Sequence, residues 1–317
     1  MKAAVVTGAG VTPIYSDFDE PLESAGFVRI EVDASALSHV TRSRAAGTHY
    51  SSSDHFPFVA GVDGVGRRDD GARVYFFGPQ APWGGLAQST LVPETQCIAL
   101  PDGLDAVAAA AMAIPGMSSW AALVERAKFV AGETVLVHGA TGASGRLAVQ
   151  VAKHLGAAKV IATGRHVPTL EALTALGADS VISLDQDERA LAHAFEPHFD
   201  AGVDIVLDYV WGPTSRALLM GAARALPDGY PMRFVQIGSI GGDAIELPSA
   251  ILRSSAITLL GSGIGSVPFE RLLLTIDGVL KAAVPSRFNV ETRAVPLAEI
   301  ASNWSIAEGR VRTVFTT

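Results

Sequence analysis

The sequence predicts an α/β protein built around a parallel sheet with crossover helices. Of its 317 residues, 49% are hydrophobic, and Val, Ile, Ala and Gly recur in short runs, as is typical of strands buried on both faces. After Pro115 and Gly116, strand-like and helix-like segments alternate regularly, which is the pattern of βαβ units. The length is sufficient for two domains.

The segment from residue 1 to about residue 101 has strand patterns without that alternation. Residues 28–32 alternate apolar and polar side chains, residues 73–77 form a buried-type run, and Gly and Pro separate such segments. These signals predict short strands joined by turns. We therefore expect an irregular, mostly β domain here.

Several strands and a well-marked helix are predicted in the following part. Leu147, Val151 and Leu155 repeat every four residues, which places them on one face of a helix over residues 146–155. Gly156 then ends that helix as a C-cap. The predicted strands are residues 134–138, 159–163, 180–183, 204–207, 234–237 and 257–260.

The most apolar window, residues 106–124, is rich in alanine and is interrupted by Pro115 and Gly116. It is too broken for a membrane span, which needs about 20 consecutive apolar residues. The window instead predicts a buried helix that ends at the junction of two domains. The chain also begins without the apolar core of a signal peptide, so we expect no membrane association.

The composition argues against several classes of function. The formal net charge is -8 without a basic stripe, which disfavours a nucleic-acid partner. Cys97 is the single cysteine, so an internal disulfide and a thiolate cluster are excluded, as is usual for a reducing compartment. We therefore expect a cytoplasmic protein.

A glycine-rich turn marks the predicted cofactor site. The strand at residues 134–138 runs directly into Gly139-Ala-Thr-Gly-Ala-Ser-Gly145 and then into a helix, which is the context of a dinucleotide-binding motif. Glycines let the backbone approach a pyrophosphate, and the N–H groups at the helix start face the anion. The alternative is a turn that merely closes a strand–helix connection. The residues assigned to the cofactor are Thr141, Gly142, Ala143, Ser144 and Gly145.

The end of the second strand distinguishes NADPH from NADH. NAD-binding sites carry Asp or Glu about 20 residues after the glycines, whereas this chain has Gly164 and Arg165 there. A guanidinium suits a 2′-phosphate, which a carboxylate would repel. We therefore predict NADPH with Arg165 at its 2′-phosphate; the alternative is a solvated Arg at a strand end. Thr163, Gly164 and His166 are assigned to the same site.

Further motifs occur before and after the turn, at residues 58–66, 85–88, 101–103, 115–118, 176–179 and 202–208. With them the chain resembles the medium-chain dehydrogenase/reductase superfamily, and within it the zinc-independent quinone oxidoreductases. The resemblance implies a GroES-like β-barrel catalytic domain over residues 1–117 and 263–317, and a Rossmann NADPH-binding domain with a doubly wound parallel sheet over residues 118–262. It also implies a homodimer joined through edge strands, here residues 257–260.

Zinc-dependent relatives in this superfamily have a Cys at the end of an early strand and a Gly-His-Glu motif after it. Here Ser38 stands where that Cys would be, and Gly61-Val62-Asp63 replaces the motif. A four-thiolate structural site is excluded because the chain has one cysteine. We therefore expect no metal, and the resemblance favours reduction of an activated alkene over metal-assisted alcohol oxidation.

The resemblance also places residues around the substrate and the nicotinamide. Tyr50 is the candidate proton donor to a developing enolate, with a loop Tyr without that role as the alternative. Trp120, after the domain junction, is a candidate for stacking on a planar substrate, with core packing as the alternative. The other pocket residues are Ser38, Thr41, Pro115 and Ser119, and contacts to the nicotinamide are assigned to Gly238, Ser239, Ile240, Gly263 and Ile264.

These features together predict an NADPH-dependent oxidoreductase that transfers hydride to a quinone or an α,β-unsaturated carbonyl without a metal. Two alternatives stay open. One is a narrower alkene reductase that acts on a 2-alkenal, a haloacrylate or an enoyl thioester. The other is a non-catalytic NADPH-binding regulatory protein.

Overall fold

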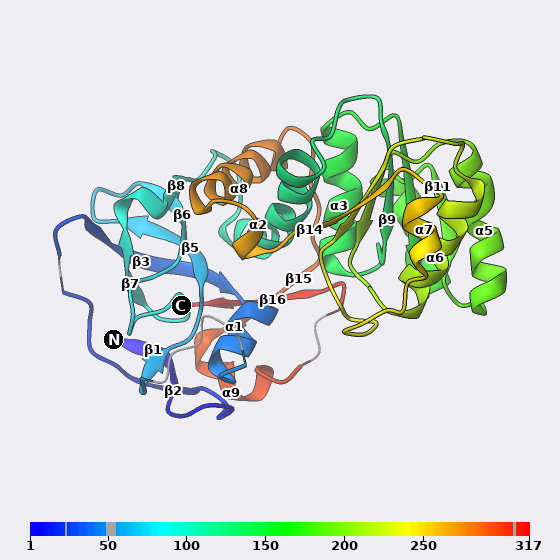
Figure 1. The fold of residues 1–317 in the computed structure, drawn as a ribbon. Coiled ribbons are helices and arrows are strands. Elements are labelled where there is room, and N and C mark those ends of the chain that lie inside the picture. Colours follow the sequence, from blue (N-terminus) through cyan, green and yellow to red (C-terminus); the bar gives the residue numbers. More distant parts are fainter. Residues whose placement is uncertain (23, 49–54, 307–308) are drawn as a thin grey trace. The chain divides into compact units, whose positions relative to one another are not determined.

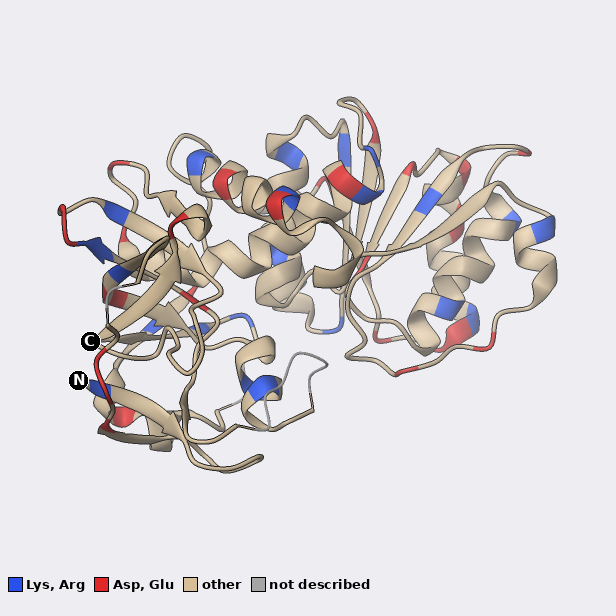
Figure 2. Ribbon diagram, turned by 60° about the vertical axis from the view of Figure 1, so that its left-hand side comes forward, with Lys and Arg blue, Asp and Glu red and all other residues tan. Residues whose placement is uncertain are grey.

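In a computed structural model, the chain divides into two compact units. The structure describes all residues except 23, 49–54 and 307–308. Unit 1 comprises Met1–Ile114 and Ala283–Thr317, and unit 2 comprises Pro115–Ala282. The divisions thus lie after residues 114 and 282, compared with expected boundaries after residues 117 and 262. Figure 2 shows acidic and basic residues interspersed on both units.

Unit 1 consists mainly of short strands. Its elements are β1 (Lys2–Val6), β2 (Ile14–Asp17), β3 (Phe27–Ala36), α1 (His39–Ala45), β4 (Phe58–Val59), β5 (Asp63–Arg68), β6 (Arg73–Phe77), β7 (Ser89–Pro93), η1 (Glu94–Gln96), β8 (Cys97–Ala99), β15 (Thr292–Pro296), η5 (Leu297–Glu299), α9 (Ile300–Asn303) and β16 (Arg312–Thr316).

These strands form two sheets that are almost entirely antiparallel. The larger sheet has the order β15-β16-β3-β5-β6-β8, with β7 also paired to β3, and the smaller one has the order β2-β1-β4. The pairing of β3 with β5 shifts register between Val32 and Ala34, and such an irregularity bends a strand. The expectation of a mostly β first domain is confirmed.

Unit 2 alternates strands and helices. Its elements are α2 (Ala106–Trp120), which begins in unit 1 and continues as a π-helical segment η2 (Ala121–Arg126), β9 (Thr134–His138), α3 (Ala143–His154), β10 (Lys159–Gly164), α4 (Val167–Glu171), η3 (Ala172–Leu176), β11 (Ser180–Ser183), α5 (Glu188–Asp200), β12 (Ile205–Asp208), α6 (Pro213–Ala225), β13 (Met232–Gln236), α7 (Ser249–Arg253), β14 (Ile257–Gly261), η4 (Ile264–Ser266) and α8 (Phe269–Ala283).

The strands of unit 2 form one parallel, six-stranded sheet. Its order is β11-β10-β9-β12-β13-β14, so the chain leaves β9 in one direction and later returns to its other side at β12. Figure 1 shows α3 on one side of this sheet and α5, α6 and α7 on the other. In such doubly wound sheets, ligands bind outside the carboxyl ends of the strands where the order reverses. That position lies between the ends of β9 and β12.

An apolar core packs against this sheet on the side of α5 and α6. Phe195 and Phe199 of α5 and Leu218 of α6 are fully buried in one cluster with Leu136 and Ile161 of the sheet. Each such side chain stabilises the fold by about 1.5–3 kcal/mol relative to its exposed state. The strand ends are therefore held by a rigid layer.

The prediction that the Ala-rich helix ends at the domain junction is wrong. α2 continues through Pro115 to Trp120, and a π-helical segment extends it to Arg126. Proline costs a helix about 3 kcal/mol, but burial offsets this cost, since Gly116 lets Val279 of α8 approach to 2.5 Å from where a Cβ would be. Residues 106–126 form a helix long and apolar enough to cross a membrane, and 67% of the apolar window is buried, as in a core helix.

The second unit boundary is later than expected because α8 packs within unit 2. The space that a Cβ on Gly278 would need is filled by the indole of Trp120, 2.8 Å away. This contact, like that between Gly116 and Val279, joins α8 to the α2 helix. In the sequence, α8 and a segment of the barrel domain both read as short stretches of mixed charge. The assignment of α8 to unit 2 therefore depends on this packing.

Candidate cofactor-binding site

The glycine-rich turn joins the end of β9 to the start of α3. Gly139 has φ +85°, and a Cβ there would lie 2.6 Å from Cγ2 of Val210. A Cβ on Gly145 would lie 2.5 Å from Cα of Ala140. Packing alone therefore requires glycine at these two positions, as in any tight strand–helix connection.

Gly142 differs from both. It is the N-cap of α3, with φ −79° and ψ 168°, a conformation open to any residue, and a Cβ there would meet no atom within 4 Å. The packing of the described residues thus gives no reason for glycine at 142. An open backbone at a helix N-terminus is suited to the close approach of an anion.

The end of β10 lies directly against the turn. A Cβ on Gly164 would lie 2.3 Å from Cγ2 of Thr141, so this glycine lets the two segments meet. The next residue, Arg165, is exposed, and among the described residues no carboxylate forms an ion pair with it. His166 caps α4, because its Nδ1 accepts a hydrogen bond of 3.3 Å from the amide of Thr169. The structure thus brings the predicted cofactor residues of both strand ends together.

A buried histidine lies behind the turn. His138, the last residue of β9, is fully buried, with Nδ1 2.9 Å from Oγ1 of Thr163 and Nε2 3.0 Å from Oγ1 of Thr214. The amide of Gly139 donates to the same Thr163 oxygen over 3.1 Å. Burial lowers the pKa of this imidazole to about 3. Thr163, predicted to assist cofactor binding, has its hydroxyl on the inner side of the turn.

A second buried polar group supports the loop after β12. The carboxylate of Asp208 accepts hydrogen bonds from the amides of Val210 and Trp211 and from Oγ of Ser215, over 2.9–3.2 Å. Burial raises the pKa of Asp208 to about 6, against the opposing effect of these bonds. Trp211 has φ +56°, which is unusual for a bulky residue. Asp208 therefore holds a strained turn at the carboxyl end of β12.

The loop after β13 packs backbone to backbone on that turn. A Cβ on Gly238 would lie 2.7 Å from the carbonyl oxygen of Tyr209, and the amide of Gly241 donates to the carbonyl of Val210 over 2.7 Å. Ser239 and Ile240, predicted near the nicotinamide, are accessible, and Ile240 is 81% exposed. Glycine is thus needed at 238 for packing, which leaves the next two residues accessible.

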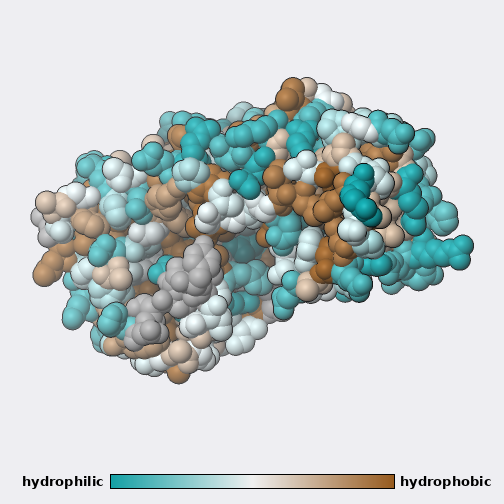
Figure 3. Space-filling model, in the orientation of Figure 1, coloured by the Kyte–Doolittle hydropathy of each residue, from teal (hydrophilic) through white to brown (hydrophobic). Residues whose placement is uncertain are grey.

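A hollow of about 530 Å³ lies beside this loop. Apolar and polar side chains share its wall, and Figure 3 shows hydrophobic surface among hydrophilic surface on the face drawn. Its lining residues are Trp211, Phe234, Gln236, Ser239, Asp243, Leu259, Leu260 and Gly261.

The loop after β14 is fixed by one arginine. Nε of Arg126 donates to the carbonyl of Gly261 over 2.7 Å and Nη1 to the carbonyl of Ser266 over 3.4 Å. Oγ of Ser266 also accepts a bond of 2.8 Å from the amide of Gly263. Arg126 was not among the predicted residues, since no local motif connects it to a loop 135 residues away.

Two of the predicted substrate residues form a helix cap in unit 1. Oγ of Ser38 accepts a hydrogen bond of 3.1 Å from the amide of Thr41 and lies 2.9 Å from its hydroxyl. This arrangement begins α1. Tyr50, the predicted proton donor, lies outside the described residues.

The other predicted substrate residues lie in unit 2. Pro115 is at the start of this unit, and the buried Ser119 hydroxyl donates back to the carbonyl of Gly116 over 3.0 Å. The Trp120 ring lies 5.6 Å from that of His154 of α3, besides its contact with Gly278. This indole therefore packs within unit 2, and its predicted stacking on a substrate stays a prediction.

A buried carboxyl in unit 1 was missed as a candidate residue. The hydroxyl of Tyr75 donates over 2.9 Å to Oδ2 of Asp63, and Oδ1 has no partner among the described residues. Burial raises the pKa of Asp63 to about 7, although Tyr75 and the charge of Arg312 oppose the shift. The sequence signal is a single acid in the apolar run from Phe58 to Val65.

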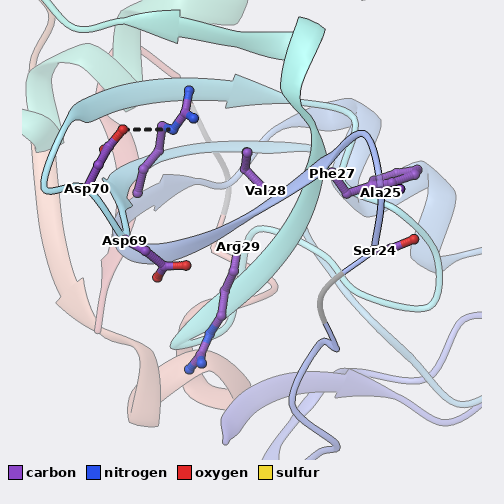
Figure 4. A pocket seen from close by; sticks show the side chains of 8 residues that line it. Ser24, Ala25, Phe27, Val28, Arg29, Asp69 and Asp70 are labelled. Atoms are coloured by element: carbon purple, nitrogen blue, oxygen red, sulfur yellow. Dashed lines mark ion pairs between the residues drawn. The ribbon is translucent and has the colours of Figure 1, made fainter.

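Unit 1 also has a hollow of about 580 Å³ between the start of β3 and the β5–β6 turn, drawn in Figure 4. Arg68 lies 3.7 Å from Asp70 and 3.0 Å from Glu94, and Arg29 lies 3.0 Å from Glu20. Since carboxylates neutralise both guanidinium groups, the hollow is not an anion site. It contains none of the predicted functional residues.

The described part of the chain holds no group of three or more His, Cys, Asp or Glu side chains that could bind a metal ion. At two positions where zinc-dependent relatives have ligands, Val62 offers no ligand atom and the Ser38 hydroxyl caps a helix. The absence of a metal stays a prediction.

Comparison with known proteins connects this site to a family. Residues 143–277 match the family described as zinc-binding dehydrogenase. A probable NADPH-dependent quinone reductase of Emericella nidulans is 30% identical, over 96% of this chain and 96% of its own. The NADPH-dependent alkenal/one oxidoreductase of Arabidopsis thaliana is 29% identical, over 86% of this chain and 74% of its own.

A solved structure has the same fold over the whole chain. The quinone oxidoreductase of Thermus thermophilus, also solved in complex with NADPH, has a TM-score of 0.79 and 27% identity, covering 100% of both chains. This likeness agrees with the antiparallel and parallel sheets described above. The chain therefore belongs to the medium-chain dehydrogenase/reductase superfamily and is a quinone oxidoreductase-like member of it.

Proposed function

We propose that the chain is an NADPH-dependent reductase that transfers hydride to a quinone or an α,β-unsaturated carbonyl. The observation that carries the proposal is the pair of features at neighbouring strand ends. Position 142 has a glycine that packing does not require, so the backbone there is accessible. Arg165 is exposed at the strand end where an NAD site has an acidic residue. The names of the Emericella and Thermus relatives support the same chemistry.

The residues of unit 2 fit the cofactor. The open N-cap at Gly142 and the amides of the first turn of α3 would hold the pyrophosphate, and the Arg165 guanidinium would bind the 2′-phosphate. The exposed loops at Ser239–Ile240 and Gly263–Ile264 would contact the nicotinamide. When bound, this ring supplies the hydride.

The acceptor chemistry does not require a metal. Hydride addition to a quinone or enone carbon spreads negative charge onto oxygen, so the protein need only position the acceptor and stabilise that oxygen by hydrogen bonds. Tyr50 is the proposed proton donor, which completes reduction of the carbon–carbon or quinone system with one proton. Ser38, Thr41, Pro115, Ser119 and Trp120 are the proposed substrate-pocket residues.

A narrower alkene reductase is the second candidate. The name of the Arabidopsis relative favours 2-alkenals and related enones. A quinone accepts hydride at oxygen or ring carbon, whereas an alkenal accepts it at the β-carbon and gains a proton at the α-carbon. Comparing the two acceptor classes therefore separates these candidates.

We further propose a cytoplasmic homodimer joined through β14. This strand pairs only with β13 in the described chain, and Leu259 on it is 39% exposed. An unpaired strand edge offers backbone hydrogen bonds to another strand. Sedimentation of the purified protein measures its mass in solution, and so tests the dimer independently of the proposed activity.

The test of function follows the absorbance of NADPH with a quinone such as 1,4-benzoquinone and an enal such as 2-hexenal. Faster oxidation with either acceptor, and slower oxidation of NADH, is expected. If NADPH binds tightly and neither acceptor is reduced, the reductase proposal fails. The non-catalytic NADPH-binding alternative would then be favoured.

A further inference from the structure

His138 is in contact with three segments that meet at the carboxyl edge of the parallel sheet. It ends β9, its Nδ1 reaches Thr163 at the end of β10, and its Nε2 reaches Thr214 at the start of α6. The ring also lies 6.2 Å from that of Phe195 in an edge-on arrangement. No solvent reaches this side chain, so its two nitrogens depend on these two hydroxyl groups.

The hydrogen-bond partners of the ring favour one tautomer. Oγ1 of Thr163 already accepts from the amide of Gly139, and its own proton has no other acceptor than Nδ1 of His138 among the described residues. Nδ1 then accepts and Nε2 carries the proton, which it donates to Oγ1 of Thr214. Because the environment is dry, the neutral ring is the favoured form.

This chain of bonds ends on the first amide of the nucleotide turn. Gly139 lies between Thr163 and Val210, with Cγ2 of Val210 only 2.6 Å from the position of a Cβ. The direction of the Thr163 hydroxyl decides whether its oxygen faces the Gly139 amide. That direction is determined by Nδ1 of His138.

We infer that His138, as a neutral Nε2–H imidazole, is a positioning residue that holds the nucleotide turn in its binding conformation through Thr163. The inference rests on the proposed function, in which this turn holds the cofactor pyrophosphate. A turn that is fixed before the ligand arrives loses less entropy on binding. His138 does not touch the cofactor and acts only on the affinity.

The test measures NADPH binding to His138→Phe, Thr163→Val and the double variant by fluorescence titration. Phe keeps the ring and removes both nitrogens. We expect each single change to weaken binding by about 10-fold, as for a site whose supporting residues are lost. The double variant should be weakened no further, because both changes interrupt the same chain of bonds. Thr163→Ser, which keeps the hydroxyl, should restore wild-type affinity.

A merely structural role would give different results. The inference would be overturned if the loss of NADPH affinity in the double variant equalled the product of the two single losses. It would also be overturned if His138→Phe kept the wild-type affinity. If His138→Phe does not fold, Thr163→Val and Thr214→Val decide the question: loss of affinity should be found for the first and, more weakly, for the second. The catalytic constant at saturating NADPH should change little in His138→Phe and Thr214→Val.

Two spectroscopic measurements do not need the cofactor. Proton–nitrogen correlation spectra of the imidazole should show an Nε2–H tautomer that stays neutral down to about pH 4, and hydrogen exchange at the Gly139 amide should accelerate in Thr163→Val. An Nδ1–H tautomer would contradict the inference. If the wild-type protein binds neither NADPH nor NADH, the proposed function fails, and the role of His138 in the turn is decided by these two measurements.

Discussion

The Tyr75 hydroxyl donates a hydrogen bond of 2.9 Å to the carboxyl of Asp63 inside unit 1, where both side chains are almost completely shielded from water. Burial holds the pKa of Asp63 at about 7, above the ordinary carboxyl value of about 3.9. The folded protein therefore binds a proton that the unfolded chain has released in the intervening pH range.

The free energy of unfolding should consequently fall as the pH rises from about 4 to 7, because the unfolded state binds fewer protons in this window. Asp63→Asn removes the titration and keeps an oxygen for Tyr75. We expect the unfolding free energy of the variant to increase relative to that of the wild-type protein as the pH rises. Urea unfolding at several pH values measures this, with the exposed Asp185→Asn as a control. A difference independent of pH would contradict the prediction.

Gly142 and Gly145 should respond in opposite ways to alanine. In Gly142→Ala the new methyl group enters open space, so unfolding should change by no more than about 0.5 kcal/mol, while binding of NADPH should weaken because the methyl group blocks the pyrophosphate. In Gly145→Ala the methyl group meets Ala140, and a loss of about 1–3 kcal/mol in stability is expected. Chemical denaturation and NADPH titration of both variants provide the measurements. Tight binding by Gly142→Ala would show that no phosphate approaches there.

Arg165→Asp should move the cofactor preference from NADPH toward NADH. Loss of charge-assisted hydrogen bonds, together with repulsion, should reduce the ratio of the two affinities by about 10- to 100-fold. The measurement is kcat/KM for each cofactor with one acceptor. Arg189→Asp on α5 carries the same charge change at another exposed position and should leave the ratio as it is. An unchanged ratio in Arg165→Asp would show that this side chain does not read the phosphate.

Asp208→Ala should destabilise unit 2 by about 3 kcal/mol, since two partly buried amides and a buried hydroxyl lose their acceptor. Ser215→Ala removes only one of these bonds and should cost about 1 kcal/mol. Denaturant unfolding compares the two variants. Equal effects would mean that Asp208 does not support the turn at Trp211, whose positive φ depends on this carboxylate.

The sequence by itself determined the regular part of unit 2 and the location of its glycine-rich turn. The strands predicted at residues 134–138 and 180–183 match β9 and β11 at both ends, and Gly156 ends α3 with φ +96°. These features depend on apolar periodicity and on glycine conformations, which are properties of a few consecutive residues. For the same reason Arg165 was proposed as a cofactor residue from its spacing alone.

The tertiary structure decided which distant residues meet. Asp63 and Tyr75 become partners because β5 pairs with β6, and His138 reaches Thr163 and Thr214 because β9 lies between β10 and β12. The helix at residues 106–126 continues through Pro115 because buried contacts outweigh a local break signal. Long-range hydrogen bonds and packing depend on strand order and burial, and no window of the sequence contains that information.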